Sequence, residues 1–311
     1  MKSAGYYAKL ISLILIIFGS SLLLTLQIAE PIKSQNYFSF SLDYAAKIVL
    51  LMVVNLYAFS LTIGAWGKWE QYLIIPLPVS VAIFMVIYTV DIFYAVVLAV
   101  LAALFMAFDI QKSTRIRELL TKFDPKIILR LSTSGLLFIF STIGGALVIL
   151  YAFVAPEYNV GKEISSIVEK PLKSLVETQL RSNLEEQLVP LNMSGGQNLD
   201  PEVESLLERF GLDINTADLS KSMDSKTITD NLIKNLDIKN IVEKEVNGFV
   251  SPYKNLVHPI LAVLMFALFQ FYAAISMFIY LVTIDGIFWL AKKSNFFKTE
   301  FEMVQKEILK F

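Results

Sequence analysis

Long apolar segments alternate with short polar connections along this chain, and one long polar segment interrupts the pattern. Apolar runs of membrane-crossing length recur through residues 10–155 and return at 259–291, whereas residues 157–256 are rich in charge and poor in aromatic side chains. A hydrocarbon core about 30 Å thick needs about 20 helical residues to cross it. The pattern predicts an all-α, polytopic membrane protein with a helical insert before its last span.

Six spans are expected from the lengths of the apolar runs. They cover about residues 10–29, 45–66, 72–90, 92–108, 135–155 and 259–283. The segment 72–108 would be about 55 Å long as one helix, which is too long for a single crossing. A tight turn at Asp91 divides this segment into two spans, and a re-entrant pair is the alternative interpretation.

The first apolar run has a second interpretation as a secretory signal peptide, because Lys2 and Lys9 precede it. Its apolar core is longer than the roughly 7–15 residues of a signal, and Gln27-Ile28-Ala29 is a poor cleavage site. We therefore expect an uncleaved first span that ends at Glu30-Pro31, because proline interrupts helical hydrogen bonding.

The connection 109–130 is the most basic part of the membrane region. It holds six Lys or Arg and three Asp or Glu, and Asp124-Pro125 is typical of the N-cap and first residue of a helix. We expect that helix to run into the fifth span. Because excess Lys and Arg in short loops mark the cytoplasmic side, both termini are expected in the cytoplasm of a multi-pass cell-membrane protein, with the insert outside.

The end of the chain is expected to lie at the membrane surface. Asp285-Gly286 interrupts the last apolar run, so residues 284–291 are predicted to form an interfacial segment rather than another span. The tail 292–311 contains the capping-box pattern Thr299-Glu300-Phe301-Glu302, which predicts a short amphipathic cytoplasmic helix.

The insert, residues 157–256, contains 17 acidic and 11 basic residues, a net charge of −6. This charge argues against nucleic acid as a partner. Apolar residues at three- and four-residue steps form one stripe from Val160 to Leu188 and a second from Ile228 to Phe249, which predicts a small antiparallel helical bundle. The expected partners are the lipid bilayer and an unidentified protein that binds the insert.

The chain has no cysteine and a single histidine, His258, which excludes thiolate metal sites, disulfides and any site that needs two histidines. The Walker A, dinucleotide, zinc-protease and nucleophile-elbow patterns are also absent from the sequence. We therefore expect no catalytic, cofactor-binding or metal-binding residues, and a protein that is not an enzyme.

Two amides, Asn55 and Gln270, fall inside predicted spans. They are candidates for lining a solute path, although a single amide more commonly hydrogen-bonds a neighbouring helix. Gly144-Gly145 in the fifth span permits close helix packing, and its alternative role is a broken-helix binding site.

Asp91 and Asp285 are candidate interfacial charges. An acid within the membrane is a functional candidate, but Asp91 at a hairpin turn and Asp285 at a helix end would avoid the cost of burying a charge. His258 adjoins the last span, where a histidine can sense pH. Asn192-Met193-Ser194 is a glycosylation sequence, which matters only in an organism with that pathway.

These observations favour a non-enzymatic interaction, scaffold or envelope-assembly protein that displays a helical domain outside the cytoplasm. The alternative is a transporter or channel for a small solute that uses Asn55, Gln270 and the glycine pair.

Overall fold

The computed structural model describes residues 4–37, 41–65, 74–119, 124–154, 159–169 and 238–296, with a few isolated positions between 171 and 178. The chain divides into two compact units. Unit 1 comprises Met1–Pro156 with His258–Phe311, and unit 2 comprises Glu157–Val257. Every regular element within the described residues is helical, in agreement with the predicted all-α class.

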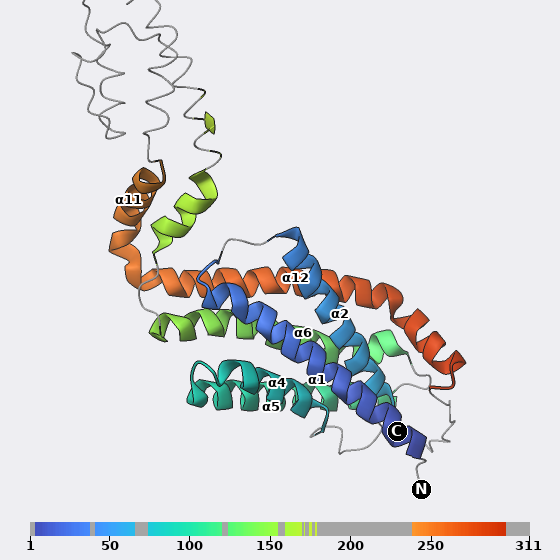
Figure 1. Ribbon diagram of the computed structural model, residues 1–311. Coiled ribbons are helices and arrows are strands. Elements are labelled where there is room, and N and C mark those ends of the chain that lie inside the picture. The colour runs from blue at the N-terminus through green and yellow to red at the C-terminus, as the bar shows by residue number, and fades with distance from the viewer. Residues whose placement is uncertain are drawn as a thin grey trace, which may run out of the picture. The chain divides into compact units, whose positions relative to one another are not determined.

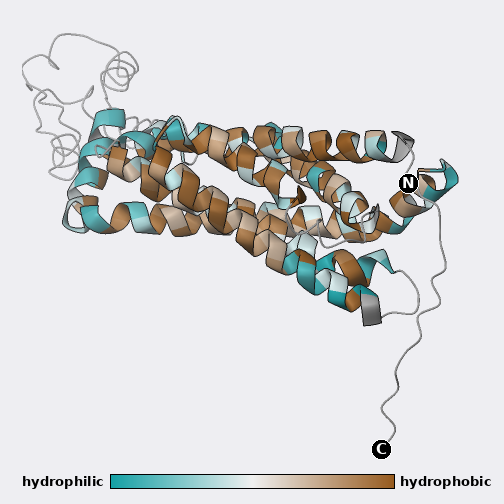
Figure 2. Cartoon of the chain, turned by 90° about the horizontal axis from the view of Figure 1, so that it is seen from below, coloured by the Kyte–Doolittle hydropathy of each residue, from teal (hydrophilic) through white to brown (hydrophobic). Residues whose placement is uncertain are grey.

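Five helical stretches are long and apolar enough to cross a membrane, which supports the predicted membrane protein. They are Tyr7–Lys33, Leu42–Gly64, Ile92–Arg117, Pro125–Val154 and Val242–Lys293. The helices that contain them are α1 (Ala4–Lys33), α2 (Leu42–Ala65), α5 (Ile92–Leu119), α6 (Pro125–Val154) and α12 (Lys254–Lys293). Apolar residues cover most of the length of these helices (Figure 2).

The segment expected as the third span, 72–90, forms a shorter element. Its helix α4 (Pro76–Ile87) has 12 residues and is about 18 Å long, with Pro76 and Pro78 in its first turn. Prolines fit there because the first amide groups of a helix have no intrahelical acceptor. A turn at 88–91 leads into α5, and α4 and α5 pack side by side as a hairpin (Figure 1).

Helix α1 lies at the centre of unit 1, where it packs against α2, α4 and α6 (Figure 1). Most of the largest fully buried side chains come from α1, α2, α6 and α12, and they include Ile17, Leu24, Phe59, Phe140 and Phe269. Helix α5 is the least buried of the five long apolar helices. Its outward side chains, such as Leu104, are apolar and therefore suited to lipid.

Side-chain pairs define the directions of the helices in unit 1. The N-terminal part of α1 meets the C-terminal end of α12, where the Lys9 ammonium donates to the carbonyl of Asn295 at 2.8 Å. The N-terminus of α6 reaches the same part of α12, with Lys126 Nζ 2.7 Å from Asp285 Oδ2. We call this side of unit 1 the Lys126 end, and the opposite side the Asp91 end.

The remaining pairs give the other directions. Ser276 and Tyr280 of α12 contact Met52 and Ser60 of α2 in ascending order, so these two helices run in parallel toward the Lys126 end. Helix α5 also ends there, because Asp109 lies against Gly135 while Arg117 borders residues 128–129 of α6. Helices α1 and α6 run the opposite way.

Three helix boundaries differ from the sequence prediction. Helix α1 continues past Pro31 to Lys33, and its end is a C-cap in which Gln35 has φ 56° and Asn36 N–H donates to the Pro31 carbonyl at 2.8 Å. The carbonyl of Gln27, four residues before the proline, accepts a hydrogen bond from the Tyr44 hydroxyl at 2.7 Å. This external donor explains why the proline is tolerated in the helix.

The other two differences concern the Lys126 end. The predicted loop 109–130 is helical through Leu119, because α5 does not stop where its apolar run stops. Helix α12 passes through Asp285-Gly286 without a break and ends at Lys293, so the predicted interfacial segment 284–291 continues the helix of the last span. A helical glycine costs only about 1 kcal/mol relative to alanine, and Lys126 pairs with Asp285. Most of the predicted amphipathic tail, 297–311, lies outside the described residues.

The predicted start of the fifth helix is confirmed. Helix α6 begins at Pro125, and the Asp124 carboxylate accepts the amide hydrogen bonds of Lys126 at 2.9 Å and Ile127 at 3.3 Å. This is N-capping, in which a side chain satisfies main-chain donors that the first turn leaves free.

Unit 2 is described by a helix at 160–169, α11 (Ile238–Val250) and a short 3₁₀ turn, η1 (Ser251–Tyr253). In the first predicted stripe Val160, Ile164 and Val168 are half-buried and Ile167 is exposed, and Phe249 of the second stripe is 78% exposed. The remainder of the predicted bundle lies outside the described residues.

Candidate functional site

Asn55 is buried between α1 and α2 and donates from Nδ2 to Ser21 Oγ at 2.6 Å. Its Oδ1 atom is also buried and accepts no hydrogen bond from the described residues. One half of this amide therefore joins two helices, and the other half is an unsatisfied acceptor within the apolar interior.

Hydroxyl groups line the contact between α2 and α12. Ser60 Oγ and Tyr280 OH lie 2.8 Å apart, and both side chains are buried. Tyr57 OH and Thr283 Oγ1 form a second pair one turn away. The rings of Tyr57 and Tyr280 are in contact, with 5.9 Å between their centroids and an angle of 35° between their planes. These pairs satisfy polar groups that would otherwise face hydrocarbon, so their first effect is to hold α12 against α2.

Gly144 and Gly145 of α6 pack against side chains and main-chain atoms of α12. A Cβ atom on Gly144 would overlap the ring of Phe269, which is fully buried, and one on Gly145 would lie 3.0 Å from the carbonyl oxygen of Ala262. Small residues permit this close approach between two membrane helices. The space beside the pair is therefore filled by α12. Gln270, the residue after Phe269, is half-buried and is not hydrogen-bonded to Asn55.

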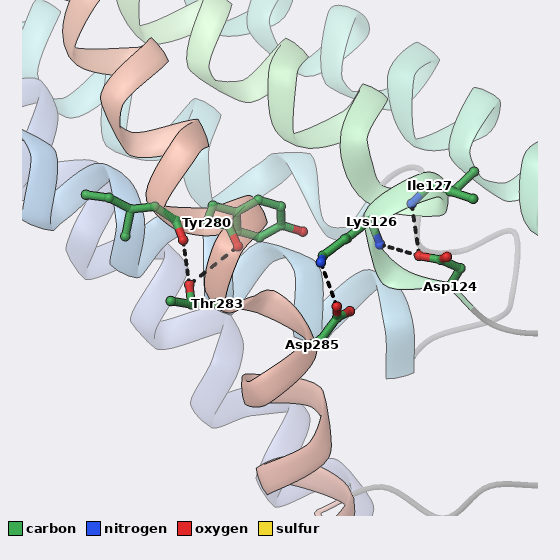
Figure 3. Close-up of polar contacts among 7 residues, drawn as sticks. Asp124, Lys126, Ile127, Tyr280, Thr283 and Asp285 are labelled. Carbon is green, nitrogen blue, oxygen red and sulfur yellow. Dashed lines mark hydrogen bonds and ion pairs between the residues drawn. The ribbon is translucent and has the colours of Figure 1, made fainter.

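Asp285 and Lys126 form an ion pair at the Lys126 end, as Figure 3 shows together with the Asp124 cap. Both side chains are about half exposed, at 57% and 44%. Exposed pairs contribute only about 0–1 kcal/mol, so this contact positions α6 relative to α12 more than it stabilises the fold.

Asp91 caps α5 at the opposite end. Its Oδ1 accepts the amide hydrogen bond of Tyr94 at 3.0 Å, and its carbonyl accepts that of Ala95 at 3.1 Å. The side chain is half-exposed at the turn between α4 and α5. The arrangement gives this acid a capping function in the hairpin.

Asp109 is the carboxylate with the least exposure among the described residues of unit 1, at 7%. It lies where a Cβ on Gly135 would stand, and its Oδ1 is 3.6 Å from the Lys112 ammonium one turn later. From the sequence this residue was expected in a loop, and its burial was not predicted. Two signals were present: a lysine three residues later, and a glycine at 135 that leaves room for the carboxylate.

In unit 2, Asn159 joins the two described helices. Its Oδ1 accepts the Lys162 amide at 2.9 Å, which caps the helix at 160–169, and its Nδ2 donates to Glu243 Oε1 at 2.6 Å. Gly161 N–H donates to Asn247 Oδ1 at 3.1 Å. His258, the first residue of the second segment of unit 1, is half-buried and takes part in an interaction, and Asn192 lies outside the described residues.

A small cavity and an open groove lie among the described helices of unit 1. A cavity of about 10 Å³, which is the size of one water molecule, lies between the ends of α2, α5 and α6, next to Ser113 and Arg117. An open apolar groove of about 270 Å³ runs between α4 and α5. No group of three His, Asp or Glu side chains in the described part of the chain has the geometry to hold a metal ion.

The sequence did not identify the hydroxyl pairs between α2 and α12 or the Tyr44 bond to Gln27. Serine, threonine and tyrosine inside apolar spans are the signal for such pairs, but their partners cannot be assigned without knowing which helices are neighbours. No protein-family model, curated protein or solved structure matches this chain.

Proposed function

We propose that this chain is a non-catalytic integral membrane protein whose unit 2 binds a protein partner outside the cytoplasm, as a scaffold or assembly factor of the cell envelope. The observation that carries the proposal is that polar groups of unit 1 are engaged in contacts between its helices. Asn55, Tyr280 and the glycine pair are engaged in contacts between helices, which gives the membrane region the character of a packed base. Acidic residues are concentrated in the insert, which holds 17 Asp or Glu.

We further propose six crossings. Helix α2 ends at the Lys126 end and α5 begins at the Asp91 end, so residues 66–91 must pass from one side of unit 1 to the other. The 18 Å length of α4 is short for about 30 Å of hydrocarbon, and the neighbouring apolar residues complete the crossing in this proposal. An even number of crossings agrees with the contact between Lys9 and Asn295, which places the first and last helix ends together.

The orientation follows from charge. The helix segments at the Lys126 end carry eight basic and four acidic residues, against two basic and three acidic at the Asp91 end. Excess Lys and Arg favour the cytoplasm, so the insert, which leaves the membrane after α6 at the opposite end, is extracytoplasmic. Reporter fusions after Lys112, Gly196 and Phe311 test this arrangement. A reporter at Gly196 on the same side as one at Lys112 would refute it.

Site-specific photo-cross-linking in native membranes tests the interaction. A photoreactive amino acid at Ser194 in the insert is expected to capture the same protein reproducibly, and one at Lys33, in a short connection on the same side, serves as the matched control. Capture of lipid alone from Ser194, or of identical proteins from both positions, would contradict a partner specific to the insert.

The second candidate function is transport of a small solute, and one observation favours it. Asn55 Oδ1 is a buried acceptor without a donor from the described residues, and unsatisfied amides within membranes mark solute paths as well as packing defects. A solute-dependent flux into vesicles that is lost in Asn55→Leu and Gln270→Leu, but retained in a Ser12→Ala control on the exposed face of α1, would favour transport over scaffolding.

A further inference from the structure

The Lys126 end gathers basic side chains from helices that are far apart in the sequence. Lys9 of α1, Lys126 of α6 and the last turns of α12 meet through the contacts of Asn295 and Asp285. Arg117 of α5 borders residues 128–129 of α6, which brings the C-terminal turns of α5 to the same place. One surface therefore collects the charges of four helix ends.

Ion pairs neutralise only part of this charge. Lys126 is paired with Asp285 and Lys112 with Asp109. Four further cations, Arg115, Arg130, Lys292 and Lys293, are exposed, and none of them forms an ion pair with a carboxylate of the described residues. They come from α5, α6 and α12, so the surplus charge is spread over the rim of the helix bundle rather than along one helix.

Aromatic rings place this charge at the height of a lipid headgroup. Lys112 Nζ lies 4.2 Å from the centroid of the Phe108 ring, Lys293 Nζ lies 4.9 Å from that of Trp289, and Lys9 Nζ lies 5.1 Å from that of Phe296. Phe108 and Trp289 are more than half exposed on helices that are apolar toward the Asp91 end. An exposed ring with a lysine extending over it is typical of the boundary between hydrocarbon and water.

We propose that the Lys126 end is a binding surface for anionic phospholipid headgroups, centred on Arg115, Arg130, Lys292 and Lys293. The cations stand where phosphate groups lie in a bilayer, and arginine matches phosphate with two parallel hydrogen bonds. The Asp91 end lacks this surplus, so the selectivity is confined to one leaflet. The proposal is independent of the role of unit 2.

The test uses the full chain in vesicles of phosphatidylcholine that contain trace spin-labelled phosphatidylglycerol or phosphatidylcholine. The fraction of label immobilised at the protein surface measures selectivity. We expect the natural sequence to prefer the anionic lipid several-fold, with each basic residue contributing at most about fivefold and with added salt weakening the preference.

Two double variants, Arg115→Gln with Arg130→Gln and Lys292→Gln with Lys293→Gln, are each expected to lower this preference, and together to abolish it. The matched control, Lys33→Gln with Lys47→Gln at the Asp91 end, removes two exposed lysines and is expected to keep it. Circular dichroism checks that helicity is unchanged. Absence of selectivity in the natural chain, an equal loss in the control, or competition by soluble glycerol phosphate stronger than that of sodium chloride at the same ionic strength would each overturn the proposal.

Discussion

The hydroxyl of Tyr44 in α2 donates to the main-chain carbonyl of Gln27 in α1 at 2.7 Å, and Pro31 is the residue whose missing amide leaves that carbonyl without its usual donor. In a helix, the amide of residue 31 would bond the carbonyl of residue 27. A side chain of the neighbouring helix therefore replaces a main-chain donor, and the helix continues to Lys33. The proline and the tyrosine act together, although they are 13 positions apart in the sequence.

Tyr44→Phe is expected to lower the free energy of unfolding by about 1–2 kcal/mol, because it leaves a carbonyl unsatisfied in a partly buried position. Equilibrium unfolding in detergent micelles measures this change. In a Pro31→Ala background the amide of residue 31 restores the donor, so the same substitution is expected to cost markedly less. Equal costs in the two backgrounds would show that the tyrosine does not compensate for the proline.

Gly144→Ala is expected to destabilise unit 1 by roughly 1–3 kcal/mol, because the added methyl group overlaps the buried Phe269 ring. Gly19→Ala on α1 is the control, since a Cβ there meets no atom within 4 Å. It is expected to be neutral or slightly stabilising, as alanine favours helices. The stabilities of the two variants are compared by measuring the midpoint temperatures of their thermal unfolding. Combining Gly144→Ala with Phe269→Leu should recover part of the loss, and no recovery would contradict the proposed contact.

Asp91→Ala is expected to cost about 1 kcal/mol through loss of the α5 N-cap, whereas Asp91→Asn should be nearly neutral because asparagine caps equally well. Chemical unfolding of the purified variants measures both. An acid with a role in proton or ion movement would lose that role in either variant. A strong functional defect in stably folded Asp91→Asn would therefore show that Asp91 does more than cap the hairpin.

Gly161→Ala is expected to loosen the contact between the two described helices of unit 2, because its Cβ would lie 2.5 Å from the carbonyl oxygen of Glu243 and 2.7 Å from Asn247 Oδ1. Hydrogen exchange of the amides at 160–169, followed by mass spectrometry, should then become faster. Gly248→Ala on α11 is the matched control, with no atom within 4 Å of its Cβ. Similar exchange in both variants would mean that the close approach at Gly161 is dispensable.

The sequence predicted the all-helical class of fold and most of the long apolar helices, but it misplaced several helix ends. The N-cap at Asp124 was recognisable because capping depends on residues adjacent in the chain. The continuation of α1 past Pro31 was not, because it depends on Tyr44 in another helix. The same reason applies to Asp109, whose burial requires Gly135 of α6 to lie beside it.

The same distinction between local and tertiary information applies to the candidate site residues. The sequence identified Asn55 and the glycine pair as positions of interest, but only the structure gives them partners in Ser21, Phe269 and Ala262. It did not single out Ser60 and Tyr280, whose hydroxyls meet because α2 and α12 are neighbours that run in parallel. Helix neighbours, and the rotation of each helix about its axis, are not encoded in the apolar length of a span.

By itself, the sequence determined that the chain forms several apolar helices of membrane-crossing length, where its polar residues are concentrated and which connections carry positive charge. These are properties of local composition, because crossing length and loop charge depend on consecutive residues. The tertiary structure alone decided which polar groups pair across helices and which helix ends gather the basic side chains. Lys9 and Asn295, 286 positions apart, come together only because packing of apolar faces brings the first and last helices of unit 1 to one end.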